Sequence, residues 1–139
     1  MSVDANGMLP IGTRLPEKRH VVDQALITAY AHVSGDMNPL HLDPEFAKTT
    51  KFGQTIAHGM MTLAFVSQAM RDWAGPAWDD QGQLAVTFVA PVFAGDEVIV
   101  RAEVKESPPG MTLCKVECWV GERLTLTGEA GIRGVPDHG

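Results

Sequence analysis

The chain has 139 residues, of which 45% are hydrophobic and 20% are charged, which indicates one globular domain with a single core. Its formal net charge is −6 and its Lys and Arg residues are scattered, so we expect no nucleic-acid partner, because phosphate contacts need clustered positive charge. The N-terminus shows no signal-peptide pattern and no apolar run reaches membrane-spanning length, so we expect a cytoplasmic protein with no membrane partner.

The sequence predicts a single domain over residues 1–139, with loose termini at residues 1–8 and 135–139. Asp23 is a suitable N-cap for the first helix, which we expect to end at Ser34 and Gly35. The apolar residues of this helix recur at helical spacing, at Leu26, Ala29, Tyr30 and Val33.

Two further helices are predicted in the first half of the chain. Residues 43–45, Asp-Pro-Glu, supply a cap, a proline for the first helical position and an acidic residue for the first turn of a short helix. Phe46 and Ala47 would form its apolar face. Residues 60–71 form a helix that is apolar on nearly every side, so we expect other elements to enclose it. Residues 72–82 are expected to be a linker.

From residue 84 onward the apolar residues recur with a period of two, which predicts β-strands. Helices followed by strands predict an α+β fold, in which an antiparallel sheet packs one face on the helix at 60–71. The edges of such a small sheet often pair with a second copy, so we expect a homodimer. The expected strands cover residues 84–89, 96–104, 111–120 and 123–133.

Cys114 and Cys118 fall on one face of the third expected strand, alternating with Lys115 and Glu117. A metal site would need a second Cys or His pair at a suitable spacing, and the sequence offers none. We therefore expect two reduced thiols in the core. Gly128 in the last strand predicts a kink or a bend around a bulky neighbour.

One short segment holds a carboxylate, an amide and an imidazole, at Asp36, Asn38 and His41. On a continuous helix Asp36 and His41 would point about 140° apart, but Gly35 and Pro39 predict a tight turn that can bring them together. An Asp and a His offer a base and an acid near neutral pH and could share one water, with Asn38 orienting the carboxylate or the water. Alternatively, Asp36 and Asn38 only form the turn, and His41 only caps the next helix.

His58 and Gly59 precede the apolar helix. A glycine at a helix start presents a backbone N–H at the positive end of the helix dipole, which suits a developing oxyanion. Alternatively, Gly59 only permits tight packing, and His58 only makes a structural hydrogen bond. Ser67, two turns into the helix, either bonds to the helix backbone or supports the loop.

Several common catalytic motifs are missing from the sequence. It contains no Gly-x-Ser-x-Gly elbow, no Gly-rich phosphate loop, no Gly-x-Gly-x-x-Gly and no His-Glu-x-x-His. What remains is acid–base chemistry, and we expect neither a metal nor a redox cofactor.

Taken together, these segments closely resemble the MaoC-like dehydratases, the R-specific enoyl-CoA hydratase family of the hot-dog fold. The likeness is strongest in the Gly-Asp-x-Asn-Pro-x-His motif of residues 35–41 and in His58, Gly59 and Met60. Further matching segments lie at residues 30–34, 46–47, 52–57, 91–96 and 127–130.

The resemblance implies an antiparallel sheet wrapped around a long central helix, in a homodimer of fatty acid metabolism. It implies that a trans-2-enoyl-CoA is hydrated reversibly to the (R)-3-hydroxyacyl-CoA, with the coenzyme A thioester as substrate and no further cofactor. In this family pattern Asp36 and His41 are catalytic, Gly59 forms the oxyanion hole, and Asn38, Ser67 and His58 occupy supporting positions.

Three other functions are compatible with this fold. One is a dehydratase acting on carrier-protein-bound or specialised acyl thioesters; carrier proteins are usually acidic, so the acidic chain favours free coenzyme A. Another is a thioesterase, which the Asp36, Asn38 and His41 pattern disfavours. The third is a non-catalytic acyl-binding partner subunit, which would not need both Asp36 and His41.

Overall fold

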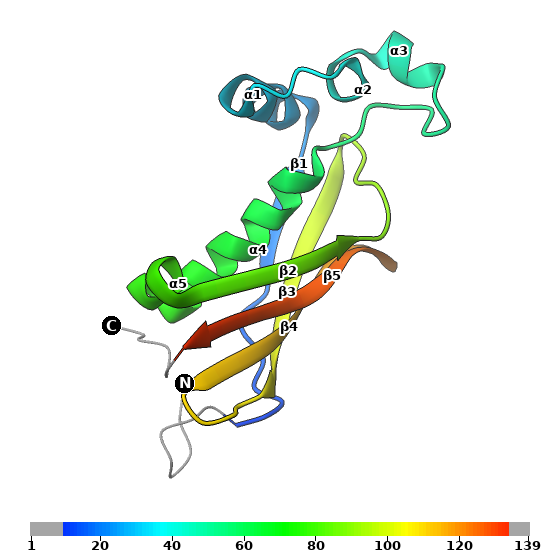
Figure 1. Cartoon of the computed structure of the whole chain (residues 1–139). Coiled ribbons are helices and arrows are strands. Elements are labelled where there is room, and N and C mark those ends of the chain that lie inside the picture. The colour runs from blue at the N-terminus through cyan, green and yellow to red at the C-terminus, as the bar shows by residue number, and fades with distance from the viewer. Residues whose placement is uncertain (1–9, 134–139) are drawn as a thin grey trace.

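The computed structural model describes residues 10–133. Within them the chain forms helices and strands in the order shown in Figure 1. The predicted loose termini at residues 1–8 and 135–139 lie outside the described residues, and the single domain over 1–139 stays a prediction. The elements are β1 (Lys18–Val22), α1 (Gln24–Ser34), α2 (Pro39–Leu42), α3 (Pro44–Lys48), α4 (Gly59–Ala74), α5 (Pro76–Gln81), β2 (Gly82–Phe88), β3 (Asp96–Glu106), β4 (Met111–Val120) and β5 (Arg123–Arg133).

The described strands form one antiparallel sheet in the order β1-β3-β4-β5-β2. The helix α4 packs along one face of this sheet and contacts β2, β3, β4 and β5 (Figure 1). Helices α1, α2 and α3 lie beyond the end of the sheet, near the start of α4 (Figure 1). The predicted α+β hot-dog fold is confirmed, and β1 and β2 are left as the two edges of the sheet.

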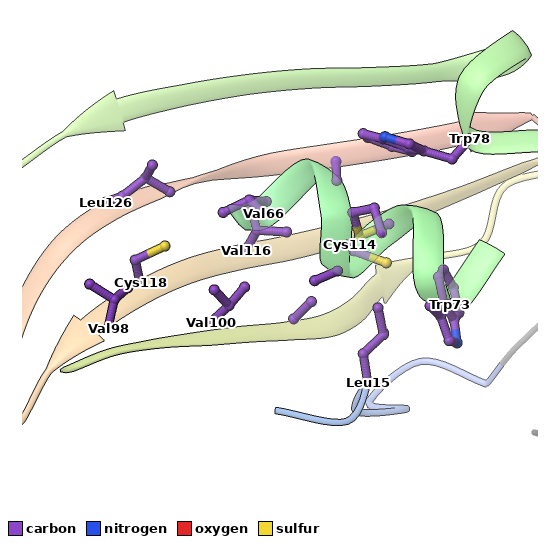
Figure 2. Packing of buried hydrophobic residues seen from close by; sticks show 14 of the residues in the cluster. Leu15, Val66, Trp73, Trp78, Val98, Val100, Cys114, Val116, Cys118 and Leu126 are labelled. Carbon is purple, nitrogen blue, oxygen red and sulfur yellow. The ribbon is translucent and has the colours of Figure 1, made fainter. Parts of the chain in front are cut away.

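The core lies between α4 and the concave face of the sheet. Figure 2 shows side chains of β3, β4 and β5 on the face of the sheet that α4 covers, among them Val100, Val116 and Leu126 together with Val66 of α4. Cys114 and Cys118 are fully buried reduced thiols in this layer, as predicted. Burial raises the pKa of each thiol to about 12, because the core disfavours the charged thiolate.

Two predictions about the middle of the chain were wrong. The expected linker at 72–82 is helical: α4 runs on to Ala74, Gly75 breaks it with a φ of +72°, and Pro76 opens α5 at a position that suits proline. Arg71 and Asp79 join the two helices through an ion pair of 2.8 Å. The helix α4 is also not enclosed on all sides, since Met60 is 57% exposed.

Other differences concern single residues and one strand. The sequence pattern did not predict β1, which pairs with β3 at the edge of the sheet. Phe46, expected on the apolar face of α3, is 43% exposed, whereas Ala47 is buried. The expected kink is not seen in the strand pairing, since Gly128 pairs in register with Val86 and Val116. The glycine instead permits close approach, because a Cβ atom there would lie 2.2 Å from the Ala85 carbonyl oxygen of β2.

No helix within residues 10–133 is long and apolar enough to cross a membrane.

Candidate active site

The turn between α1 and α2 is built by local hydrogen bonds. Gly35 ends α1 in the left-handed region, with a φ of +81°, and its N–H donates to the Ala31 carbonyl. The Asp36 Oδ1 atom accepts from the Asn38 N–H at 3.3 Å, and the Asn38 Oδ1 atom accepts from the Leu40 N–H at 3.0 Å. Asn38 is thus the N-cap of α2, so its side-chain oxygen stabilises the helix that carries His41.

Asp36 and His41 face each other, as the turn predicted. The Asp36 Oδ2 and His41 Nε2 atoms are 3.9 Å apart, which is beyond a direct hydrogen bond. The His41 Nδ1 atom lies 2.7 Å from the Ile56 carbonyl oxygen. Because a carbonyl only accepts, Nδ1 carries a proton, and in the neutral imidazole the lone pair is on Nε2, the nitrogen that lies near Asp36. The carboxylate is accessible, with its side chain 55% exposed, whereas His41 is buried.

His58 joins the start of α4 to this turn. Its Nε2 atom donates to the Asp36 carbonyl oxygen at 3.0 Å, and its ring stacks on the His41 ring with centroids 3.8 Å apart. The Tyr30 ring of α1 also contacts the His58 ring, with centroids 4.8 Å apart. His58 is 3% exposed, and its Nδ1 atom has no hydrogen-bond partner among the described residues. The structure therefore brings a buried His58 into contact with the His41 ring and the Asp36 backbone.

Gly59 is the first residue of α4, where the backbone N–H has no partner within the helix. A Cβ atom at Gly59 would lie 3.1 Å from the Phe88 ring, so the glycine permits close packing as well as access. Beside it opens a pocket of about 360 Å³. Its wall is mostly apolar and consists of Phe52, Ile56, Ala57, His58, Gly59, Thr62, Phe88, Val89, Ala90, Pro91, Val92 and Thr125.

Ser67 is not part of this pocket. Its hydroxyl accepts a hydrogen bond of 2.9 Å from the Trp78 indole N–H, so it ties α5 to α4. The two roles expected for Ser67, a bond to its own helix backbone or support of the loop, did not include a bond to Trp78. Any support that Ser67 gives to the site passes through the packing of these two helices.

The donor atoms of Asp36, His41 and His58 lie within 4.8 Å of one another, a spacing that could suggest a metal site. The two imidazole planes, however, are only 22° from parallel and are stacked. Lone pairs lie in the ring planes, so stacked rings do not direct them at a common ion. One nitrogen of each ring is also bonded to a backbone carbonyl. The geometry favours proton transfer over metal coordination.

Sequence reasoning missed two polar residues behind the pair. Gln24 of α1 donates to the His41 carbonyl oxygen at 2.9 Å and accepts from the Thr55 hydroxyl at 2.7 Å. Gln24 and His41 are 17 positions apart, and no motif in the sequence connects them. Phe88, at the end of β2, was likewise not expected beside Gly59.

Comparison with known proteins supports the likeness inferred from the motif. The chain is 40% identical to the (R)-specific enoyl-CoA hydratase of Aeromonas caviae over 113 residues, covering 78% of this chain and 84% of the relative. It is 34% identical to the 3-hydroxybutyryl-CoA dehydratase of Methylorubrum extorquens, covering 77% of this chain and 69% of that protein. The solved structure of the R-hydratase PhaJ1 from Pseudomonas aeruginosa superposes with a TM-score of 0.82 at 30% identity, covering 95% of this chain and 86% of that one.

The family model of the MaoC-like domain matches residues 8–122, which include the turn, both histidines and the start of α4. The chain belongs to the MaoC-like dehydratase family.

Proposed function

We propose that this protein is a hydro-lyase that adds water reversibly to a trans-2-enoyl-CoA and forms the (R)-3-hydroxyacyl-CoA. The observation that carries the proposal is the 3.9 Å separation of Asp36 Oδ2 and His41 Nε2. Ile56 and His58, which contact His41, also line the apolar pocket beside Gly59. Two acceptor atoms at this distance can each receive one hydrogen from a single water.

The tautomer of His41 supports this use of water. The Nδ1–H group of His41 is hydrogen-bonded to the Ile56 carbonyl, so the neutral imidazole offers Nε2 as an acceptor, and the Asp36 carboxylate offers Oδ2. A water held by both has its oxygen lone pairs free to attack C3 of the enoyl group. The proton that the pair removes from the water is returned to C2, so both groups end in their starting protonation state. Asp36 and His41 act as one unit in this step.

Attack at C3 places negative charge on the thioester oxygen. The Gly59 N–H lies at the positive end of α4, where the helix dipole is equivalent to roughly half an elementary charge. A preorganised donor at that position stabilises the enolate-like transition state more than the substrate. We assign the oxyanion hole to Gly59 on this basis.

The pocket next to Gly59 suits an acyl chain. Phe52, Phe88, Val89 and Val92 supply apolar surface, and its volume of about 360 Å³ is within the range of small-molecule sites. The reaction needs no cofactor beyond the coenzyme A of the substrate. We place Asn38 and His58 in supporting roles through their bonds to Leu40 and to the Asp36 carbonyl.

The proposed assembly is a homodimer in the cytoplasm. The edge strand β2 ends at Phe88, which is 49% exposed and is followed by Val89, which is 52% exposed. An unpaired edge that carries large apolar side chains is a common site of self-association. A second copy on β2 would cover apolar surface next to the pocket.

The test is a hydration assay with purified protein. Crotonyl-CoA and longer enoyl-CoA substrates are expected to lose their enoyl absorbance, and the product is expected to be oxidised by an R-specific but not by an S-specific 3-hydroxyacyl-CoA dehydrogenase. Much faster turnover of the carrier-protein-bound substrate would favour the carrier-bound alternative. Release of free thiol would favour a thioesterase, and no turnover of any thioester would favour a non-catalytic partner subunit.

A further inference from the structure

The Gln24 side chain links three segments that meet behind the imidazole of His41. Its Nε2 atom donates to the His41 carbonyl oxygen at 2.9 Å, and its Oε1 atom accepts from the Thr55 hydroxyl at 2.7 Å. Gln24 lies at the first position of α1, His41 on α2 and Thr55 in the loop that precedes α4. One carboxamide therefore ties both helices to the loop that leads to the oxyanion donor.

The loop that holds Thr55 is itself anchored to the sheet side of the molecule. The Ala57 N–H donates to the Val92 carbonyl at 2.7 Å, and the Ala94 N–H donates to the Thr55 carbonyl at 3.3 Å. Thr55 is 5% exposed. The hydroxyl that holds Gln24 thus sits on a segment with little freedom to move.

The segment that contains Thr55 and Ile56 holds His41 through two separate hydrogen-bond routes. The carbonyl of Ile56, the residue after Thr55, accepts a hydrogen bond of 2.7 Å from His41 Nδ1–H. The loop therefore holds the imidazole of His41 directly and holds its backbone carbonyl through Gln24. Both ends of the residue are fixed from the same anchored segment.

The chemistry of the three groups determines how the amide is oriented. A carbonyl oxygen only accepts, so the Gln24 NH₂ group must face His41, and its oxygen is left for the Thr55 hydroxyl. A carboxylate at position 24 would still accept from Thr55 but could not donate to His41. The remaining contact of the amide, to Thr28 Oγ1 at 3.4 Å, does not reach His41.

We propose that Gln24 is a positioning residue for His41, acting with Thr55 to hold the Nε2 lone pair in line with Asp36. The inference rests on the proposed function, because it assumes that His41 and Asp36 share the reacting water. Small displacements of a reacting group have large effects on rate: a misplacement of about 1 Å can lower it roughly a hundredfold. His41 is held by Ile56 at its ring and by Gln24 at its backbone carbonyl, and loss of the Gln24 bond is expected to lower kcat about tenfold.

The test combines kinetics with histidine NMR. Gln24→Met removes the bonds to His41, Thr55 and Thr28 at similar side-chain length, and Gln24→Glu keeps the acceptance from Thr55 but removes the donations to His41 and Thr28. Thr55→Val removes the hydroxyl, Thr55→Ser retains it, and Thr28→Val is the matched control on the same helix. Each protein is assayed with crotonyl-CoA, its melting temperature is measured, and ¹⁵N-histidine spectra, assigned with His41→Gln, report the tautomer of His41.

Gln24→Met and Gln24→Glu are expected to lower kcat about tenfold, with KM changed less than about twofold, while Thr28→Val and Thr55→Ser match the wild type. The His41 signals are expected to move from a fixed Nδ1-protonated form toward tautomer averaging in both Gln24 variants and in Thr55→Val. If Gln24→Met does not fold, the kcat values and His41 spectra of Gln24→Glu and Thr55→Val test the positioning role instead.

Wild-type kcat and an unchanged His41 spectrum in the folded Gln24 variants would overturn the inference. So would a lower melting temperature with unchanged kcat and spectrum, since that would show a purely structural role. If the wild-type protein hydrates no enoyl thioester while the His41 spectrum still responds to Gln24 and not to Thr28, the proposed function fails but Gln24 retains its positioning role.

Discussion

The proposed reaction predicts that Asp36→Asn abolishes most activity while leaving the fold intact. The substitution keeps an oxygen that can accept from the Asn38 N–H, so the turn retains its bond. The Asp36 side chain is 55% exposed and its Oδ2 atom is 3.9 Å from His41 Nε2, so the free energy of unfolding is expected to change by less than about 1 kcal/mol. General acid–base catalysis contributes about 100- to 10,000-fold, so kcat should fall by at least two orders of magnitude, or about 2.7 kcal/mol in the barrier.

His41→Ala gives the complementary measurement. It is also expected to lower kcat by at least two orders of magnitude and to stay folded. It should destabilise the protein more than Asp36→Asn does, by about 1–3 kcal/mol, because it leaves the carbonyl of the half-buried Ile56 without its donor and removes the ring stacked on His58. Enoyl-CoA hydration is followed by absorbance, and stability by urea unfolding.

The double variant and a matched control make the prediction refutable. Two groups that act on the same water lose their effect together, so Asp36→Asn with His41→Ala should be hardly slower than the slower single variant. Asp43→Asn is the control, since Asp43 is another exposed carboxylate that caps a helix but makes no contact with His41. Fully multiplicative losses in the double variant, or an equal loss in Asp43→Asn, would refute the shared-water arrangement.

Three further predictions concern stability. Gly128→Ala should destabilise the protein by about 1–3 kcal/mol in urea unfolding, because the new methyl group would meet the Ala85 carbonyl of β2; an unchanged midpoint would contradict that contact. Trp78→Phe should lower the free energy of unfolding by about 1–2 kcal/mol through loss of the bond to Ser67, with kcat unchanged, and a large loss of kcat would place α5 in the site instead. The raised pKa of Cys114 and Cys118 predicts that the free energy of unfolding falls as the pH rises from about 9, the unfolded thiol pKa, toward 12. Only the unfolded thiols ionise in this range, so the expected slope is about 1.4 kcal/mol per pH unit and thiol, and below about pH 9 the contribution to stability is complete. Replacing both cysteines by alanine should flatten this alkaline slope in unfolding measurements.

The parts of the fold that were predictable from sequence are those specified by local chemistry. Asp23 and Gly35 bound α1 as capping residues do, and period-two burial located β3, β4 and β5. The short edge strand β1 was missed because Lys18, Arg19 and His20 interrupt any apolar pattern. The helix α5 was missed because two glycines and a proline in residues 72–82 indicated a loop, and its bond from Trp78 to Ser67 of α4 could not be inferred from the local pattern.

The same distinction applies to the site. The proximity of Asp36 to His41 and the position of Gly59 at the start of α4 were predictable because the turn and the helix start carry recognisable local signals. The tautomer of His41 depends on the Ile56 carbonyl, 15 positions away, and the Gln24 bond on a partner 17 positions away. Such long-range pairings follow from the packing of α1 and α2 against the loop, which no local pattern encodes.

The acid–base pair and the apolar pocket are carried by different stretches of the chain. Asp36 and His41 sit between α1 and α3, whereas Phe88, Val89 and Val92 belong to the end of β2 and the loop that follows it. Under the proposed function, substitutions at the end of β2 are therefore expected to change which acyl group is accepted while leaving Asp36 and His41 in place. For an engineer, this makes the end of β2 the first place to diversify in a library selected for new substrates.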